Sequence, residues 1–195
     1  MSTIRLEIEN RKGLKLQAYL ELPANQKPNH FAIFAHCFSC NSNFNAVKNI
    51  SRSLSTHGFG VLRFDFTGLG KSEGEFAESH FSAKVEDLLD MSTYLEKHYK
   101  AASLLVGHSL GGAAVIVAAS KLESVKAVAT IGAPATVNHV THLFSHAIDA
   151  IPEKGEIEVQ IGGRPFKINQ DFVADFSKTA LPEIIKELRK RISQT

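Results

Sequence analysis

Four short apolar runs, separated by segments with helical periodicity, constrain the fold of this chain more than any other feature. The runs are FAIFA at 31–35, GVLRFD at 60–65, SLLVG at 103–107 and AVATI at 127–131. Unbroken apolar runs of this length are typical of strands that are buried on both faces. Their alternation with helices predicts a parallel sheet with right-handed crossovers and helices on both sides. Functional residues are then expected at the carboxyl ends of the strands.

The segments around these runs complete an α/β pattern. Alternating apolar residues at 4–8 and 14–20 predict a two-stranded antiparallel start. Apolar residues at helical spacing predict a helix from Phe44 that closes at His57-Gly58, and a long helix from Phe81 that ends near Lys100. The small residues of 113–119 predict a helix that approaches the sheet closely.

The region from 137 to 176 departs from this alternation. A helical stretch is followed by EIEVQI, Gly162-Gly163 and RPFKI, which predict a hairpin with a two-glycine turn. We interpret it as a lid inserted into a single domain that spans residues 1–195. A last amphipathic helix is expected from Leu181 to Ile192.

Composition bounds the chain without naming a partner. The 195 residues, 44% of them hydrophobic, suffice for one core, and 22 basic against 20 acidic residues favour neither nucleic acid nor an anionic membrane surface. No apolar stretch is long enough to span a membrane, and residues 1–10 do not resemble a secretory signal. A cytoplasmic location is the resulting prediction.

The sequence Gly107-His108-Ser109-Leu110-Gly111 lies between the third apolar run and the small-residue helix. In this strand–turn–helix context, Gly-x-Ser-x-Gly places a nucleophilic serine on a strained turn with an exposed hydroxyl. The Leu110 amide, at the amino terminus of the helix, is suited to stabilise an oxyanion. We therefore predict Ser109 as the catalytic nucleophile. The alternative is a glycine-softened turn with a capping serine.

This motif, with His36-Cys37-Phe38 and DFTGLGKS at 65–72, resembles the α/β-hydrolase family over nearly the whole chain. The set AHCFSC, VLRFDFTGLG, GHSLGG, ATIGAP and GGRPFKI further resembles the hydrolase half of bacterial proteins in which such a domain is fused to an OsmC-type peroxide-handling domain. The resemblance implies an α/β-hydrolase fold, with a mostly parallel sheet, helices on both faces and a small lid. It also implies ester hydrolysis or acyl transfer on a small acyl or ester substrate, without a cofactor or metal.

The resemblance extends to other site residues. The family's loop after the third strand carries His-Gly-X and lends a second backbone N–H to the oxyanion hole, and here Cys37 stands where glycine is usual. Residue by residue, the carry-over assigns this role to Phe38, with Cys37, beside Leu110. Residues that support the motifs without reacting are then His36, Asp65, Gly107, His108 and Gly111.

The remainder of a catalytic triad is not visible in the sequence. The family's acid follows a seventh strand and its histidine an eighth, but here residues 132–195 read as lid and helix. We expect a truncated domain that lacks the last two strands, weak or inactive on its own. A catalytically silent binding or assembly module is the alternative function. His142 or His146 with Asp149 as a substitute pair would fit no familiar arrangement.

Three other motifs suggest different chemistry. Residues 65–72 nearly match a phosphate-binding loop, but a carboxylate, Asp65, stands where that loop begins with glycine. Cys37-x-x-Cys40 suggests thiol chemistry, although two cysteines do not indicate an oxidised scaffold, and a pair buried in the core is the simpler reading. His139, His142 and His146 share one face of the expected lid helix, but no carboxylate or cysteine completes an obvious metal site.

The expected end of the sheet has a consequence for assembly. If the sixth strand is the last, it is an open edge that can pair with another chain. Self-association through this edge is therefore predicted.

Overall fold

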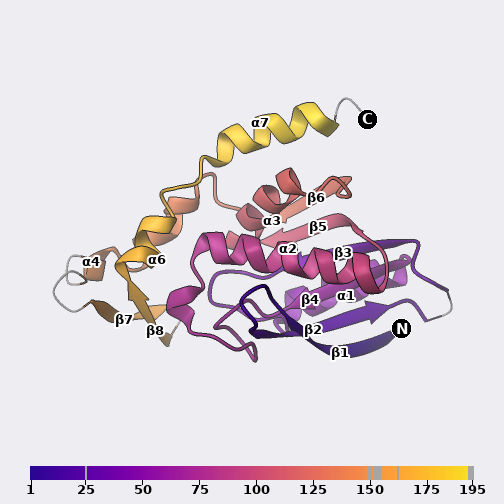
Figure 1. Cartoon of the computed structure of the whole chain (residues 1–195), viewed down its shortest axis with the longest axis horizontal. Helices are drawn as coiled ribbons and strands as arrows, with labels where there is room; N and C mark the ends of the chain where they lie inside the picture. The colour runs from indigo at the N-terminus through magenta and orange to yellow at the C-terminus, as the bar shows by residue number, and fades with distance from the viewer. Residues whose placement is uncertain (25, 149–150, 152–154, 162, 193–195) are drawn as a thin grey trace.

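A six-stranded sheet runs through the molecule in the order β1-β2-β4-β3-β5-β6 (Figure 1). The structure, a computed structural model, describes residues 1–24, 26–148, 151, 155–161 and 163–192. The strands are β1 (Ser2–Glu9), β2 (Lys15–Leu22), β3 (His30–Ala35), β4 (Phe59–Phe64), β5 (Ala102–His108) and β6 (Ala127–Ile131). The apolar runs of the sequence thus form the four strands β3 to β6.

Strand directions place one end of each parallel strand at the same edge of the sheet. β1 pairs with β2, and β2 with β4, in antiparallel register, whereas β4, β3, β5 and β6 are mutually parallel. The segments that leave these four strands at Ala35, Phe64, His108 and Ile131 therefore gather at one edge. This confirms the mostly parallel sheet that the sequence predicted.

Helices cover the sheet on both faces. α1 (Asn45–Thr56) packs on one face, against apolar side chains that include Phe34 and Val61. α2 (Phe81–His98) and α3 (Leu110–Lys121) cover the other face, where the larger hydrophobic core lies. α7 (Leu181–Ile192) packs against α3 and is drawn in yellow in Figure 1. Alternating strands and helices therefore produce the two-sided α/β architecture.

Residues 137–176 lie beyond the carboxyl ends of the parallel strands (Figure 1). The elements of this segment are η2 (Val137–Leu143), α4 (Ser145–Ile148), β7 (Glu156–Ile161), β8 (Arg164–Asn169) and α6 (Gln170–Asp175). β7 and β8 form a separate two-stranded antiparallel sheet, and the pairing of Ile161 with Arg164 leaves a two-residue connection, as predicted. Gly163 has a φ of 76°, whereas Gly162 lies outside the described residues.

The helical stretch at the start of this segment differs from the prediction. Instead of one helix it is a 3-10 helix that ends at Leu143, and a separate α4 begins at Ser145. Phe144 interrupts the two because its side chain is fully buried in the main core. Burial of one aromatic ring therefore overrides the continuous helical spacing.

A carboxylate ties this segment to the rest of the fold. Asp175 of α6 accepts hydrogen bonds from the amide (2.7 Å) and hydroxyl (2.8 Å) of Ser82 in the first turn of α2. Burial acts to raise the pKa of Asp175, but the Ser82 hydrogen bonds and nearby His80 and Lys178 outweigh it and hold the pKa below its ordinary value. The ionised carboxylate thus caps the amino terminus of α2.

β6 forms one edge of the main sheet as the structure describes it. Four of its five residues are exposed, and Ile131 retains 42% of its accessible surface. Such an edge leaves backbone groups available for pairing. No helix in the described part of the chain has the length and apolar character needed to cross a membrane.

Candidate active site

Ser109 lies at the turn from β5 into α3, at the carboxyl ends of the parallel strands. Among the described non-glycine residues it is the only one with positive φ, at φ 54° and ψ −123°. Its amide donates to the Ile131 carbonyl of β6 at 2.8 Å, and its carbonyl accepts from the Gly112 amide at 2.8 Å. The side chain is half-buried, and no described residue forms a hydrogen bond with its hydroxyl. The backbone reversal therefore holds an unpaired hydroxyl at the edge of the sheet.

Gly107 and Gly111 allow this turn because no side chain fits at either position. A Cβ on Gly107 would lie 2.4 Å from the Gly111 carbonyl oxygen. A Cβ on Gly111 would lie 2.3 Å from the His36 carbonyl oxygen and 2.5 Å from that of Ala35. The start of the loop after β3 consequently passes directly against the first turn of α3.

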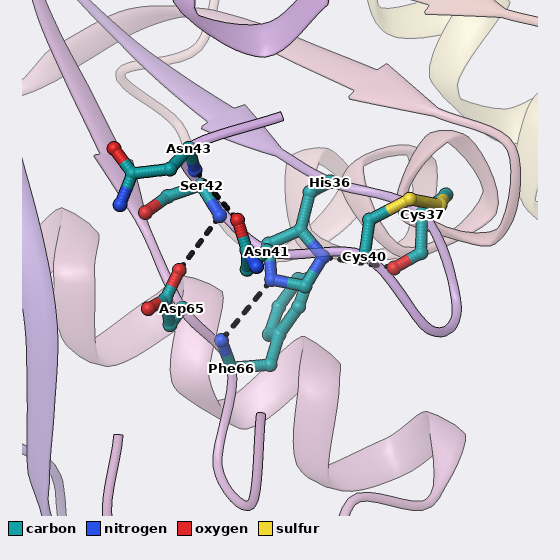
Figure 2. The surroundings of a disulfide bond; sticks show 8 residues. All are labelled: His36, Cys37, Cys40, Asn41, Ser42, Asn43, Asp65 and Phe66. Atoms are coloured by element: carbon teal, nitrogen blue, oxygen red, sulfur yellow. Dashed lines mark hydrogen bonds between the residues drawn. A yellow bond between two sulfur atoms is a disulfide. The ribbon is translucent and has the colours of Figure 1, made fainter. Parts of the chain in front are cut away.

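The loop of residues 36–44, called here the 36–44 loop, is organised around the buried imidazole of His36 (Figure 2). Its Nδ1 contacts the Cys37 carbonyl at 2.8 Å, and its Nε2 accepts from the Phe66 amide at 3.4 Å. Because a carbonyl only accepts, Nδ1 carries the proton. Burial lowers the pKa of His36 to about 4, so the ring is neutral at pH 7 and keeps both roles.

The far end of the 36–44 loop is fixed by buried charges. Asp65 accepts from the Ser42 amide at 2.6 Å, and Arg63 donates to the Ser42 carbonyl at 2.9 Å. Arg63 in turn forms a buried ion pair with Glu21, at 2.9 Å. Phe44, at the end of the loop, stacks on His108 with ring centroids 6.4 Å apart. The loop therefore contacts the Ser109 turn at both of its ends.

Two backbone amides have no acceptor in the described part of the chain, one directly after Ser109 and one in the loop that contacts the Ser109 turn. They belong to Leu110, the first residue of α3, and to Phe38 in the 36–44 loop. The first amides of a helix have no partner inside it, and they carry the positive end of its dipole. Neither amide is therefore used in a hydrogen bond within the described residues.

The Phe38 side chain joins the loop to residues 137–176. It is buried and lies within 6.4 Å, between ring centroids, of Phe76, Phe144, Phe172 and Phe176. Aromatic pairs at such separations stabilise each other beyond simple burial. The position of the loop and that of the 137–176 segment are therefore coupled through one ring.

Sequence reasoning missed Lys84, a fully buried residue of α2 beneath these rings. Its ammonium donates to the Ser79 hydroxyl at 2.8 Å and lies 4.7 Å from the centroid of the Phe66 ring and 6.0 Å from that of Phe38. Burial lowers its pKa to about 7, against a smaller opposing effect of Asp87. The signal was present, because Lys84 falls on the same helical stripe as Phe81 and Leu88.

The structure corrects the expectation for the two cysteines. Cys37 and Cys40 are joined by a disulfide and are half-buried, rather than two reduced thiols within the core (Figure 2). Their Cα atoms are 5.2 Å apart, within the range that a disulfide spans, because the chain turns between them. Counting cysteines gave no information on this local turn.

The 65–72 loop is occupied by its own carboxylate. Asp65 accepts from the Lys71 amide at 2.9 Å, in addition to the Ser42 amide. A Cβ on Gly70 would lie 2.2 Å from an oxygen of this carboxylate. The Asp65 side chain thus takes up amides of the loop whose sequence resembled a phosphate-binding loop.

The lid histidines do not form the shared face that the sequence suggested. His139 and His142 lie on the 3-10 helix with ring centroids 4.7 Å apart, and the His142 ring contacts the His139 carbonyl. The break at Phe144 separates them from His146 in α4. Asp149 lies outside the described residues. Within the described residues, no group of three or more His, Cys, Asp or Glu side chains is placed to hold a metal ion.

Comparison with known proteins agrees with this architecture. Residues 26–176 match the family described as serine aminopeptidase, S33. The palmitoyl-protein thioesterase ABHD10, mitochondrial, of Rattus norvegicus is 30% identical over 143 residues. That match covers 71% of this chain and 45% of the rat protein, so the chain spans about half the length of this relative.

Solved structures extend the similarity to nearly the whole chain. The esterase domain from a Rhodothermus marinus protein is 41% identical, with a TM-score of 0.74, over 97% of this chain and 73% of that one. Est1E from Butyrivibrio proteoclasticus with bound ferulic acid has a TM-score of 0.78 over 92% of this chain and 73% of its own, and at 23% identity it shares the fold. The chain belongs to the serine aminopeptidase S33 family and has the α/β-hydrolase fold.

Proposed function

We propose that this chain is the esterase or acyl-transfer type of serine hydrolase, with Ser109 as its nucleophile. The observation that carries the proposal is the left-handed backbone of Ser109 between β5 and α3. The acceptor-free amide of Leu110 follows it directly, and the loop that carries the acceptor-free amide of Phe38 contacts this turn. This is the geometry of a nucleophile elbow. The esterase and thioesterase names of its relatives support the reaction class.

The reaction follows from these groups. The Ser109 hydroxyl attacks the carbonyl carbon of a small acyl or ester substrate, and its proton passes to a base. The Leu110 and Phe38 amides receive the negative charge on the carbonyl oxygen, with Cys37 at the edge of this oxyanion hole. Collapse expels the alcohol or thiol, and water or another acceptor then removes the acyl group from Ser109. Residues 137–176 act as a lid over the site.

Deprotonation of the Ser109 hydroxyl is the step that limits turnover by this chain. Within the described residues nothing forms a hydrogen bond with the Ser109 hydroxyl, and a serine without a base stays protonated. Removing the histidine of a related site lowers kcat by several orders of magnitude. We therefore expect weak turnover by this chain alone, although the proposed oxyanion amides need no base.

A fluorophosphonate probe tests the proposal. It should label the chain at Ser109, identified by peptide mass, and Ser109→Ala should abolish labelling. Ser120→Ala, a serine in the same helix, is the matched control and should label like the parent. Labelling that persists in Ser109→Ala would exclude Ser109 as the nucleophile.

The unpartnered hydroxyl specifically favours one alternative, a catalytically silent binding or assembly module. Failure of the probe to label both this chain and a version extended with its native downstream sequence would support the silent module. A Cys37/Cys40 redox protein is a weaker alternative, because it leaves the Ser109 turn unexplained.

The finer resemblance remains a prediction. We propose that the chain is the hydrolase part of a longer protein with an OsmC-type domain, located in the cytoplasm. The coding sequence that follows Thr195 tests this directly. An Asp after one buried strand, a His after the next and then an OsmC-type domain is the expected order.

A further inference from the structure

The Cys37–Cys40 disulfide lies in the least anchored part of the 36–44 loop (Figure 2). His36 is fixed on one side of it by Phe66 and by packing against α3, and Ser42 is fixed on the other by buried charges. Between these two anchors, the described contacts of the backbone are few. The disulfide is therefore a covalent constraint on the turn that contains Phe38, in addition to the packing of the buried Phe38 ring.

One peptide group links this turn to the proposed chemistry. The Cys37 carbonyl and the Phe38 amide belong to the same planar unit, in which C=O and N–H point in opposite directions. The carbonyl accepts from His36 at 2.8 Å and from the Cys40 amide at 3.4 Å. Whatever fixes the carbonyl thus also fixes the direction of the Phe38 N–H.

The disulfide joins the same two residues as the longer of these hydrogen bonds. At 3.4 Å the bond from the Cys40 amide is weak, so it depends on the covalent link that keeps Cys40 close to Cys37. Without the link, only His36 and the buried Phe38 ring would restrain the peptide. An amide whose direction varies stabilises the oxyanion much less, because this stabilisation depends on preorganised donors.

The sulfur atoms belong to half-buried residues on a surface loop, just before α1. Thiol–disulfide exchange needs access of a thiolate to one sulfur, and a Cys-x-x-Cys pair near a helix amino terminus favours a stabilised leaving thiolate. The half-buried state of both residues is compatible with attack by a small dithiol in the folded chain.

We propose that Cys37–Cys40 is a thiol-exchange site whose oxidation state sets the Phe38 oxyanion peptide. A thiolate of a small dithiol attacks one sulfur and releases the other as a thiolate. The second thiol of the reagent then displaces the protein from the mixed disulfide. The reagent leaves as a cyclic disulfide, and both cysteines take up protons; oxidation is the reverse. The effect on catalysis rests on the proposed function of Ser109.

Redox titration of the folded full chain tests the exchange. The chain is equilibrated in mixtures of reduced and oxidised dithiothreitol, trapped with iodoacetamide and weighed intact. A single transition from no added groups to two is expected without denaturant. Sulfurs that react only after urea unfolding would overturn the proposal.

Two readouts then test the link to the oxyanion peptide. On reduction, fluorophosphonate labelling of Ser109 should slow about 10-fold at saturating probe, with a change of less than about twofold in the half-saturating concentration. Amide hydrogen exchange in residues 36–41 should become faster. Cys40→Ser should match the reduced chain in both readouts, and added reductant should change neither readout in this variant.

The outcomes separate this inference from the proposed function. Equal labelling rates and equal exchange in both oxidation states would overturn the inference and leave Ser109 as the nucleophile. Faster exchange on reduction, with no labelling in either state of this chain or of a version extended with its native downstream sequence, would support the redox control of the loop and remove the proposed hydrolase function.

Discussion

Neighbouring residues hold Ser109 in a backbone conformation with positive φ that is unfavourable for a serine. Left-handed backbone costs a non-glycine residue roughly 1–2 kcal/mol, and the hydrogen bond to Ile131 and the close approach of Gly107 to Gly111 maintain it. Strain of this kind is retained where it positions a functional group. At the residue scale, this turn is the strongest sign of chemistry in the molecule.

Lys84 provides a prediction about pH. Its pKa falls from 10.5 unfolded to about 7 folded, so the unfolded chain binds more protons between these values and stability should rise with pH across this window. The slope contributed by this one group is at most about 1.4 kcal/mol per pH unit. Lys84→Met should remove that rise and increase the free energy of unfolding at pH 7.

Urea unfolding from pH 6.5 to 10 measures this effect. Lys97→Met, an exposed position in the same helix, is the matched control and should leave the pH profile unchanged. If the free energy of unfolding of Lys84→Met changes with pH as that of the parent does, the buried ammonium is not the cause of the pH dependence.

At the scale of elements, the 36–44 loop and the 137–176 segment depend on each other. Phe38 is shared between them, and Asp175 attaches the segment to α2. Residue spacing could predict the hairpin, since its alternation and glycine turn are local signals. It could not predict the break at Phe144 or the disulfide, because both depend on neighbours brought close by the folded chain.

Asp175→Asn tests the attachment. The amide cannot supply two anionic acceptors to Ser82, so we expect a loss of about 1–2 kcal/mol of stability and faster hydrogen exchange in 137–176. The difference from the parent should be constant above the ordinary pKa of an aspartate. It should vanish as pH falls through the lowered pKa of Asp175, where the parent carboxylate is also protonated.

Asp171→Asn is the control for this change, because Asp171 is exposed in the same short helix. Chemical unfolding from pH 2 to 8 and exchange mass spectrometry provide the measurements. A similar loss in both variants would mean that net charge, and not the Ser82 contact, is responsible.

At the scale of the whole molecule, the exposed β6 edge predicts assembly. Unpaired backbone groups along β6 should pair with a second chain, so the apparent mass should rise with concentration. Ala129→Lys, which adds a charge to the exposed edge, should reduce this rise. Ile4→Lys on β1, the opposite edge, is the control.

Size-exclusion chromatography with light scattering tests this assembly. A constant monomer mass at every concentration would contradict pairing through β6. If both lysine variants reduce the rise in apparent mass equally, the added charge acts through general solubility and not through the β6 edge.

The sequence by itself determined the strand runs, their parallel order with helices on both faces, and the position of Ser109 at the strand–helix turn. These features follow from local periodicity and from glycines at fixed spacing, which neighbours in the chain specify. Only the tertiary structure decided the Cys37–Cys40 bond, the buried Lys84 beneath Phe38, and the role of Asp65 within its own loop. Lys84 and Phe38 come from separate segments that meet only when the sheet has formed, as do Asp65 and Ser42. The two cysteines are three residues apart, but contacts of His36 and Ser42 with residues 63–66 hold the loop in which they meet.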